Sequence, residues 1–281
     1  MAPEFVTFHA DRPKGADRVH PNANLRTENY MCMLDLLFRS VRLFNPGAKC
    51  VLLTDVATQV LGVTGKFARI NSKVDHSKLM LSRSSAQLVY VEHCTFAAPL
   101  VLIDSDILLN APISPVFTQD FDVALTWRIS PTMPINGGLV ILNNRRPQVA
   151  RAFFRRFVDI YRERYVEQSA WFGDQLALRD CVGMRAEEMS DSMIITIGDC
   201  RVLLLPCETH NFSPENHFGA IEARLKNKVV LHFKGPRKRL MVPYWTSYLR
   251  PRESGSPWVH FQGWWERRRV RLLAQAERRA A

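Results

Sequence analysis

The sequence has no apolar run long enough to cross a bilayer. Residues 1–5 lack a basic region followed by an apolar core, so they do not predict a signal peptide. The six cysteines show no Cys-x-x-Cys spacing, which argues against a zinc site or a disulfide framework. There is also no internal repeat or low-complexity linker. We therefore expect a cytoplasmic globular protein with reduced thiols.

Acidic residues are scarce near the C-terminus. From His232 to the end, twelve lysines and arginines stand against three acids, so this segment carries nine of the eleven excess positive charges. The rest of the 281-residue chain is nearly neutral and long enough for one large α/β domain. We predict a catalytic domain over residues 1–250 and a basic, aromatic-rich appendage over residues 251–281.

Strands and helices alternate in the first half of the chain. A polar loop is expected over residues 9–25. Apolar runs predict strands over residues 5–8, 49–54, 67–70, 101–103, 122–127, 139–142, 202–205 and 229–231. Helical spacing predicts helices over residues 27–44, 76–92, 148–165 and 175–180. This alternation predicts an α/β fold with a mainly parallel sheet, whose ligands bind beyond the carboxyl ends of the strands.

Two acids follow the buried strand Val101–Ile103. Side chains at i and i+2 of an extended chain point the same way, so Asp104 and Asp106 can hold one divalent cation or its bound phosphates. Ser105 lies between them. The plain structural alternative is a turn in which an Asp caps the chain.

Two further motifs combine glycine with polar side chains. Asn136-Gly137-Gly138 precedes a predicted strand, where its glycines permit close backbone approach to a ligand; an ordinary turn is the alternative. Gly173-Asp174-Gln175 begins a predicted helix and puts a carboxylate and an amide at its N-terminus, where Asp174 can equally be an N-cap.

The last motif is His232-x-x-Gly235-x-x-Lys238, directly after a buried strand. A His at a strand end can bind a metal, a Gly admits a phosphate to the backbone, and a Lys neutralises that phosphate. Otherwise this loop is solvated basic surface.

This ordered set of motifs resembles the GT-A-fold glycosyltransferases, most closely family 8, a retaining group that includes lipopolysaccharide α-galactosyltransferases. The resemblance runs from about Phe5 to Lys238 and includes a Leu205-Pro206 and Asn211-Phe212 segment before the final strand. It implies a GT-A (Rossmann-like) fold with a central, mainly parallel sheet flanked by helices.

The resemblance also implies residue roles. Asp104, Asp106 and His232 would hold Mn²⁺ (or Mg²⁺) against the diphosphate of a nucleotide sugar such as a UDP-hexose. The sugar pocket would be lined by Asn136, Asp174 and Gln175, with Gln175 near the anomeric face. Other donor-binding positions would be Ser105, Gly137, Gly235 and Lys238. A basic residue of the helix before the metal-binding strand would assist the diphosphate, with Arg83 and Lys78 as the candidates. His9, Ala10 and Asp11 would lie near the base and the ribose.

The sequence departs from the family pattern at two places. The usual Asp-x-Asn-Tyr signature is absent, because Glu28-Asn29-Tyr30 lies too far along the chain to equate with it. Arg239-Leu240 also replaces the usual Pro-Trp after the final motif Lys. These departures leave the identity of the nucleotide base open.

A nucleoside diphosphate leaving group needs a metal and cations rather than a general acid. Retention would follow from front-face attack, in which the departing phosphate helps to deprotonate the acceptor, and the amide of Gln175 suits that chemistry. One alternative is an inverting GT-A transferase with Asp174 as the base. Another is a catalytically silent GT-A-like domain that binds glycans or nucleic acid.

The C-terminal segment combines aromatics with arginines. Trp258, Phe261, Trp264 and Trp265 precede an Arg-rich helical stretch, a pattern that suits an interfacial anchor on an anionic leaflet. We expect peripheral attachment to the inner face of the cytoplasmic membrane, where an enzyme of polysaccharide biosynthesis meets lipid-linked acceptors. Nucleic-acid binding is a less favoured interpretation. A further alternative is that the aromatics pack on the catalytic domain.

Overall fold

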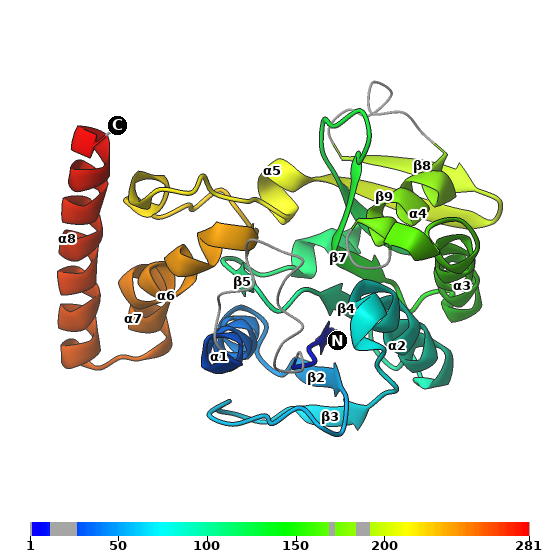
Figure 1. Cartoon of the computed structure of the whole chain (residues 1–281), viewed down its shortest axis with the longest axis horizontal. Helices are drawn as coiled ribbons and strands as arrows, with labels where there is room; N and C mark the ends of the chain where they lie inside the picture. The colour runs from blue at the N-terminus through cyan, green and yellow to red at the C-terminus, as the bar shows by residue number, and fades with distance from the viewer. Residues whose placement is uncertain (1, 12–26, 169–171, 184–191, 281) are drawn as a thin grey trace.

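The computed structural model describes residues 2–11, 27–168, 172–183 and 192–280. Most of the loop expected over residues 9–25 therefore lies outside the described residues. Eight strands form one sheet in the order β3-β2-β1-β4-β7-β6-β9-β8 (Figure 1). Their bounds are β1 Glu4–Phe8, β2 Lys49–Thr54, β3 Ala68–Asn71, β4 Leu100–Ile103, β6 Val123–Trp127, β7 Ile135–Leu142, β8 Met193–Ile197 and β9 Cys200–Pro206.

The sheet is parallel where the sequence alternates strand and helix. β3, β2, β1 and β4 run the same way, as do β6 and β9. β7 is antiparallel to both β4 and β6, so its first residues lie at the edge where β4 and β6 end. A second, two-stranded sheet pairs β5 (Ile107–Leu109) with β10 (Val230–His232) in antiparallel register.

Helices cover both faces of the main sheet, with α2, α3 and α4 grouped together and α1 and α6 apart from them (Figure 1). The α-helices are α1 Thr27–Phe44, α2 Leu79–His93, α3 Pro147–Arg164, α4 Gly173–Val182, α5 Cys207–His210, α6 Met241–Tyr244, α7 Arg250–Glu253 and α8 Pro257–Ala280. Short 3₁₀ turns are η2 His76–Lys78, η3 Ser114–Thr118, η4 Val166–Gln168, η6 Phe218–Ile221 and η7 Gly235–Leu240, and η8 (Trp245–Leu249) is a π-helical turn. Within the described ranges, none of the helices combines the length and hydropathy that a membrane span requires.

The hydrophobic core has two layers because successive strand side chains point to opposite faces. Phe5 and Val101 pack with α1 and α6 on one side, whereas Val6 and Leu102 pack with α2, α3 and α4 on the other. Strands buried on both faces read as continuous apolar runs, which explains why the sequence predicted them well. This two-sided packing fixes the carboxyl edge of the sheet, where polar residues emerge.

Most predicted elements are confirmed, and α1 and β2 have the predicted bounds. The prediction that Asn136-Gly137-Gly138 precedes its strand is wrong, because β7 begins at Ile135 and includes all three residues. Asn136 pairs with Thr126 across a bulge in the β6–β7 ladder. β5 and β8 were not predicted; both are short, and β8 is only half-buried.

α8 is one continuous helix that packs on the body of the protein along a narrow face. Val270 and Ala274 are fully buried, and Glu277 accepts a hydrogen bond from the backbone N–H of Phe218 at 2.6 Å. Each of the four aromatics is about half exposed or more: Trp258 63%, Phe261 50%, Trp264 47% and Trp265 56%. These four rings are therefore only partly buried.

Candidate functional site

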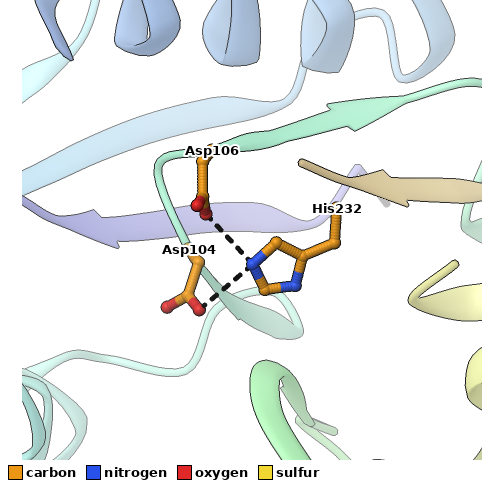
Figure 2. Close-up of side chains that lie close together, drawn as sticks. All are labelled: Asp104, Asp106 and His232. Carbon is orange, nitrogen blue, oxygen red and sulfur yellow. Dashed lines mark ion pairs between the residues drawn. The ribbon is translucent and has the colours of Figure 1, made fainter. Parts of the chain in front are cut away.

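Asp104, Asp106 and His232 meet beyond the end of β4 (Figure 2). The two acids flank the turn between β4 and β5, and β10 pairs with β5 so that His232 lies opposite Ile107. One ligand atom from each residue lies within 4.8 Å of the others. His232 Nε2 is 3.0 Å from Asp106 Oδ1 and 3.6 Å from Asp104 Oδ2. Ser105 lies half-buried in the turn between the acids.

Each acid divides its two oxygens between two partners. Asp104 Oδ1 pairs with Arg83 and Asp106 Oδ2 is 2.7 Å from Lys238 Nζ, while the other oxygen of each acid faces His232. Ligand atoms bound at ~2.1–2.2 Å around an octahedral ion lie ~3 Å apart, close to the separations seen here. Two carboxylate oxygens and one imidazole nitrogen therefore face a common point, and this donor set fits a divalent cation.

A buried hydrogen-bond network determines which nitrogen of His232 carries the proton. The Gly138 N–H donates to Asn136 Oδ1 (3.0 Å), and the Thr126 hydroxyl donates to the Asn136 carbonyl (3.1 Å). Asn136 Oδ1 and the Thr126 hydroxyl oxygen must then accept from Asn211 Nδ2, at 2.9 and 2.8 Å. Asn211 Oδ1 consequently faces His232 Nδ1 at 2.8 Å, so Nδ1 holds the hydrogen.

The neutral imidazole of His232 thus turns the lone pair of Nε2 toward the two acids. Burial lowers the pKa of His232, although Asp106 opposes this shift, so the ring is neutral near pH 7. Burial alone would raise the pKa of Asp106, but the adjacent ammonium of Lys238 holds that pKa well below its ordinary value. A lone pair facing two carboxylates is unfavourable unless a cation lies between them. This arrangement is the strongest indication of a metal site.

Both glycines of the Asn136-Gly137-Gly138 motif are required by packing within the site. A Cβ on Gly138 would lie 2.5 Å from His232 Cε1 and 3.0 Å from Asp104 Oδ2. A Cβ on Gly137 would lie 2.6 Å from Asp174 Oδ2. The sequence predicted close approach of a ligand here, whereas the structure brings the side chains of other site residues against the glycines.

Arg83, rather than Lys78, reaches the site from the helix before β4. It is buried on α2 and bridges two acids, pairing with Asp104 and, at 2.6 Å, with Asp174 Oδ2. Lys78 is exposed at the start of the same helix. Although burial lowers the pKa of Arg83, the charges of Asp104 and Asp174 outweigh it and raise the pKa above its ordinary value. Arg83 therefore links the metal-type cluster to the N-terminus of α4.

Asp174 and Gln175 occupy the first turn of α4. Phe172 precedes them with φ +70°, and Gly173 passes so close to Tyr161 that a Cβ would lie 2.4 Å from its ring. Asp174 is only 3% exposed, and burial raises its pKa. It is no N-cap, since Phe172 occupies that position. Gln175 Oε1 accepts a hydrogen bond from Arg128 Nη2 at 3.1 Å, which leaves its amide NH₂ group for other partners.

The loop after β10 supplies two lysines and a left-handed glycine. Gly235 has φ +56°, which favours glycine, and begins η7, on which Lys238 lies beside Asp106. Lys234 is half-buried at the start of this loop and interacts electrostatically with Asp104, Asp106 and Arg128. Neither Lys234 nor Arg128 was singled out in the sequence, because Arg128 lies outside the motifs and Lys234 occupies a variable position of the last one.

His9, Ala10 and Asp11 follow β1 at the same edge of the sheet. His9 and Ala10 are buried, and His9 Nε2 lies 3.1 Å from Asp11 Oδ1. The ring centroid of His9 is 5.3 Å from that of Tyr30. Tyr30 belongs to the Glu28-Asn29-Tyr30 segment that lies far from β1 in the sequence, yet α1 brings its ring to this end of the site.

The chain was compared with known proteins in three ways. No protein-family model matches it, and no curated protein sequence matches it significantly. Among solved structures, the glycosyltransferase GlyE of Streptococcus pneumoniae TIGR4 aligns with a TM-score of 0.53 at 13% identity, over 96% of this chain and 64% of GlyE. The bifunctional glycosyltransferase WbbM aligns with a TM-score of 0.53 at 13% identity, over 93% of this chain and 51% of WbbM. The chain thus spans between half and two thirds of these proteins. At such identities the likeness shows the fold, which is the GT-A glycosyltransferase fold.

Proposed function

We propose that this protein is a metal-dependent glycosyltransferase that moves a hexose from a nucleotide diphosphate sugar, most simply a UDP-hexose, to a glycan or lipid-linked acceptor with retention of configuration. The observation that carries the proposal is the cluster of Asp104, Asp106 and His232 at the carboxyl edge of a GT-A sheet, with Nε2 of His232 facing both acids. The order of its motifs supports membership of family 8.

The donor set supports Mn²⁺ over Mg²⁺. Mg²⁺ prefers an all-oxygen shell, whereas a set that includes an imidazole nitrogen suits a transition ion. When bound, the ion would neutralise the charge that develops on the departing diphosphate. Asp104, Asp106 and His232 would hold it, and Asn211 would keep His232 in the required tautomer.

The other residues would bind and orient the donor. Lys238 would contact the diphosphate, and the left-handed turn at Gly235 would let a phosphate approach the backbone. His9, Ala10 and Asp11 would lie beside the nucleoside, since they follow β1 on the other side of β4 from the sugar pocket. These assignments rest on the motif order together with the observed positions of the side chains.

Retention is supported by the surroundings of Asp174. An inverting transferase needs an accessible carboxylate as base, but Asp174 is almost fully buried and paired with Arg83. That environment suits a group that holds sugar hydroxyls and orients α4. Gln175 presents an amide rather than a base, as front-face attack assisted by the leaving phosphate requires.

A catalytically silent GT-A-like domain that binds glycans or nucleic acid is the second candidate. A domain that had lost its activity would be expected to have lost at least one of the metal-binding side chains or the lysine proposed to bind the diphosphate. Asp104, Asp106, His232 and Lys238 are all present and lie together. We therefore favour the enzyme.

A thermal-shift screen tests the proposal. Nucleotide diphosphate sugars are added to the protein with Mn²⁺, and again with excess EDTA. We expect at least one of them, most simply a UDP-hexose, to raise the melting temperature only when Mn²⁺ is present, because a ligand that binds the native state stabilises it. Stabilisation that is the same with EDTA would contradict a metal-bridged donor.

A further inference from the structure

This inference rests on the proposed function. In the site that it defines, Arg128 and Lys234 lie on the side of the transferred sugar. Along the carboxyl edge of the sheet the strand order is β2, β1, β4, β7, β6, β9. His9 follows β1, Asp104 follows β4, Asn136 begins β7, and Arg128 follows β6. Two strands, β4 and β7, therefore separate Arg128 from the proposed nucleoside end.

The other cations of the site already have anionic partners. Arg83 pairs with Asp104 and Asp174, and Lys238 pairs with Asp106. A divalent ion on the acids would offset the two charges of a donor diphosphate. Arg83 and Lys238 balance two of the three acids, and the metal balances the diphosphate, so one negative charge is left for any further cation.

Arg128 and Lys234 add two positive charges, one more than that remaining negative charge can balance. Arg128 donates to Gln175 Oε1 and, at 3.1 Å, to the carbonyl of Met133, both neutral groups. Neither Arg128 nor Lys234 forms an ion pair with any carboxylate in the described part of the chain. Their shared neighbour Cys207 is no counter-ion, because burial raises the pKa of its thiol.

Lys234 interacts with Asp104 and Asp106 as well as with Arg128, but the two half-buried cations together exceed the negative charge available to them, and such an excess is costly to hold in place without a further anion. Arg128 is fixed by Gln175, which we place at the anomeric face, so that anion belongs beside the transferred sugar. We propose that Arg128 and Lys234 bind a carboxylate or phosphate group beyond the donor diphosphate, carried by the donor sugar or by the acceptor. The substrate is then an acidic glycan rather than a neutral one.

The test has two arms, one for each source of the anion. In the first, the affinities of UDP-glucuronate and UDP-glucose are compared in the presence of Mn²⁺. In the second, the protein loaded with Mn²⁺ and UDP is titrated with glucose 6-phosphate and with glucose. We expect a preference of about 10-fold or more for the anionic probe in one arm, since a charge-assisted hydrogen bond contributes that much.

Substitutions identify the residues responsible. Arg128→Gln and Lys234→Gln should each lower the ratio of anionic to neutral affinity about 10-fold, and Arg128→Lys should retain most of it because the charge remains. Arg239→Gln is the matched control: it makes the same charge change in the same loop, but Arg239 is exposed and paired with Glu277. The control should keep the full ratio.

The two arms also separate the outcomes. A preference in the first arm assigns the anion to the donor sugar, and one in the second assigns it to the acceptor. No preference in either arm by a protein that binds UDP with Mn²⁺ overturns this inference alone, as does a preference that survives both Arg128→Gln and Lys234→Gln. Failure of Mn²⁺-dependent UDP binding overturns the proposed function and this inference with it.

Discussion

Asn211 determines whether His232 can act as a metal ligand. The NH₂ group of its amide donates to Asn136 Oδ1 and to the Thr126 hydroxyl oxygen. The first is an amide oxygen, and the hydroxyl of Thr126 already donates its hydrogen to the Asn136 carbonyl, so both oxygens act as acceptors. Asn211 Oδ1 therefore accepts a hydrogen bond from Nδ1 of His232, and the lone pair of Nε2 stays free to bind a cation. Partners of metal ligands typically contribute 10- to 100-fold in metal affinity.

We therefore predict that Asn211→Leu weakens Mn²⁺ binding by about 10- to 100-fold without unfolding the protein. The leucine fills a similar volume but leaves the imidazole free to take the other tautomer. Titration of Mn²⁺ without nucleotide, followed by electron paramagnetic resonance, measures the affinity directly.

Asn143→Leu is the matched control, since Asn143 is also a buried asparagine but follows β7 at the opposite edge of the sheet. It should cost stability and leave the Mn²⁺ affinity unchanged. Equal Mn²⁺ affinities for wild type and Asn211→Leu would show that the tautomer is set in another way.

Asp104, Asp106 and His232 could be predicted from the sequence because each lies at an end of a buried strand. The role of Asn211 could not, because it depends on hydrogen bonds among four separate segments. Arg128 and Lys234 were missed for a different reason, since neither is a defining residue of a sequence motif. Tyr30 was not equated with the family signature because it lies far from β1 in the sequence. In the structure, α1 brings its ring against that of His9, which follows β1.

At the scale of elements, continuous apolar runs gave reliable strands and helical spacing gave reliable helices. β7 was predicted four residues too short because Asn-Gly-Gly is typical of a turn. In the structure, ladder pairing with β6 and close packing against Asp174 and His232 favour an extended glycine segment. Local sequence preference was outweighed by tertiary contacts that no local pattern encodes.

α8 has two unlike faces. Its buried face holds Val270 and Ala274, and its exposed face carries Trp258, Phe261 and Trp264. These three rings form a row, with 5.6 Å between the centroids of the first two and 5.9 Å between those of the last two. An exposed aromatic row followed by arginines suits an anionic membrane surface, to which each basic residue contributes about 1 kcal/mol. We propose that this face attaches the protein to anionic lipid near its acceptor.

Replacing Trp258, Phe261 and Trp264 together by Gln should abolish sedimentation with vesicles that contain anionic lipid. Thermal stability should change little, because the three rings are exposed. Truncating α8 is a poorer experiment, because Val270 and Ala274 belong to the core. Wild-type binding should also weaken as salt rises, since the Debye length is only ~8 Å at 0.15 M.

Val89→Gln and Leu61→Gln serve as controls, because both side chains are exposed and apolar but lie outside α8. They should sediment as wild type does. The attachment proposal fails if the triple variant still sediments, or if the wild-type protein ignores anionic vesicles.

At the scale of the whole molecule, the strand order brings residues from distant parts of the chain to one edge. The same edge holds the buried, paired Asp174 and the amide of Gln175 beside the metal-type cluster. We predict that the first product formed from an α-linked donor has the α configuration, as NMR of the fresh reaction mixture would show. A β product would assign the enzyme to the inverting class and make Asp174 the first candidate for its base.

The central claim is that Asp104, Asp106 and His232 hold a metal that activates a nucleotide sugar. The most direct test is the rate at which the protein hydrolyses a UDP-hexose without acceptor, measured with Mn²⁺, with excess EDTA, and for Asp106→Asn. We predict hydrolysis with Mn²⁺, none with EDTA, and recovery when Mn²⁺ is restored. Asp106→Asn should lower the rate by about 100-fold or more while the protein stays folded. Asp120→Asn, the same change at an exposed acid, should keep the wild-type rate. Full hydrolysis in EDTA, or an unimpaired Asp106→Asn protein, would contradict the claim.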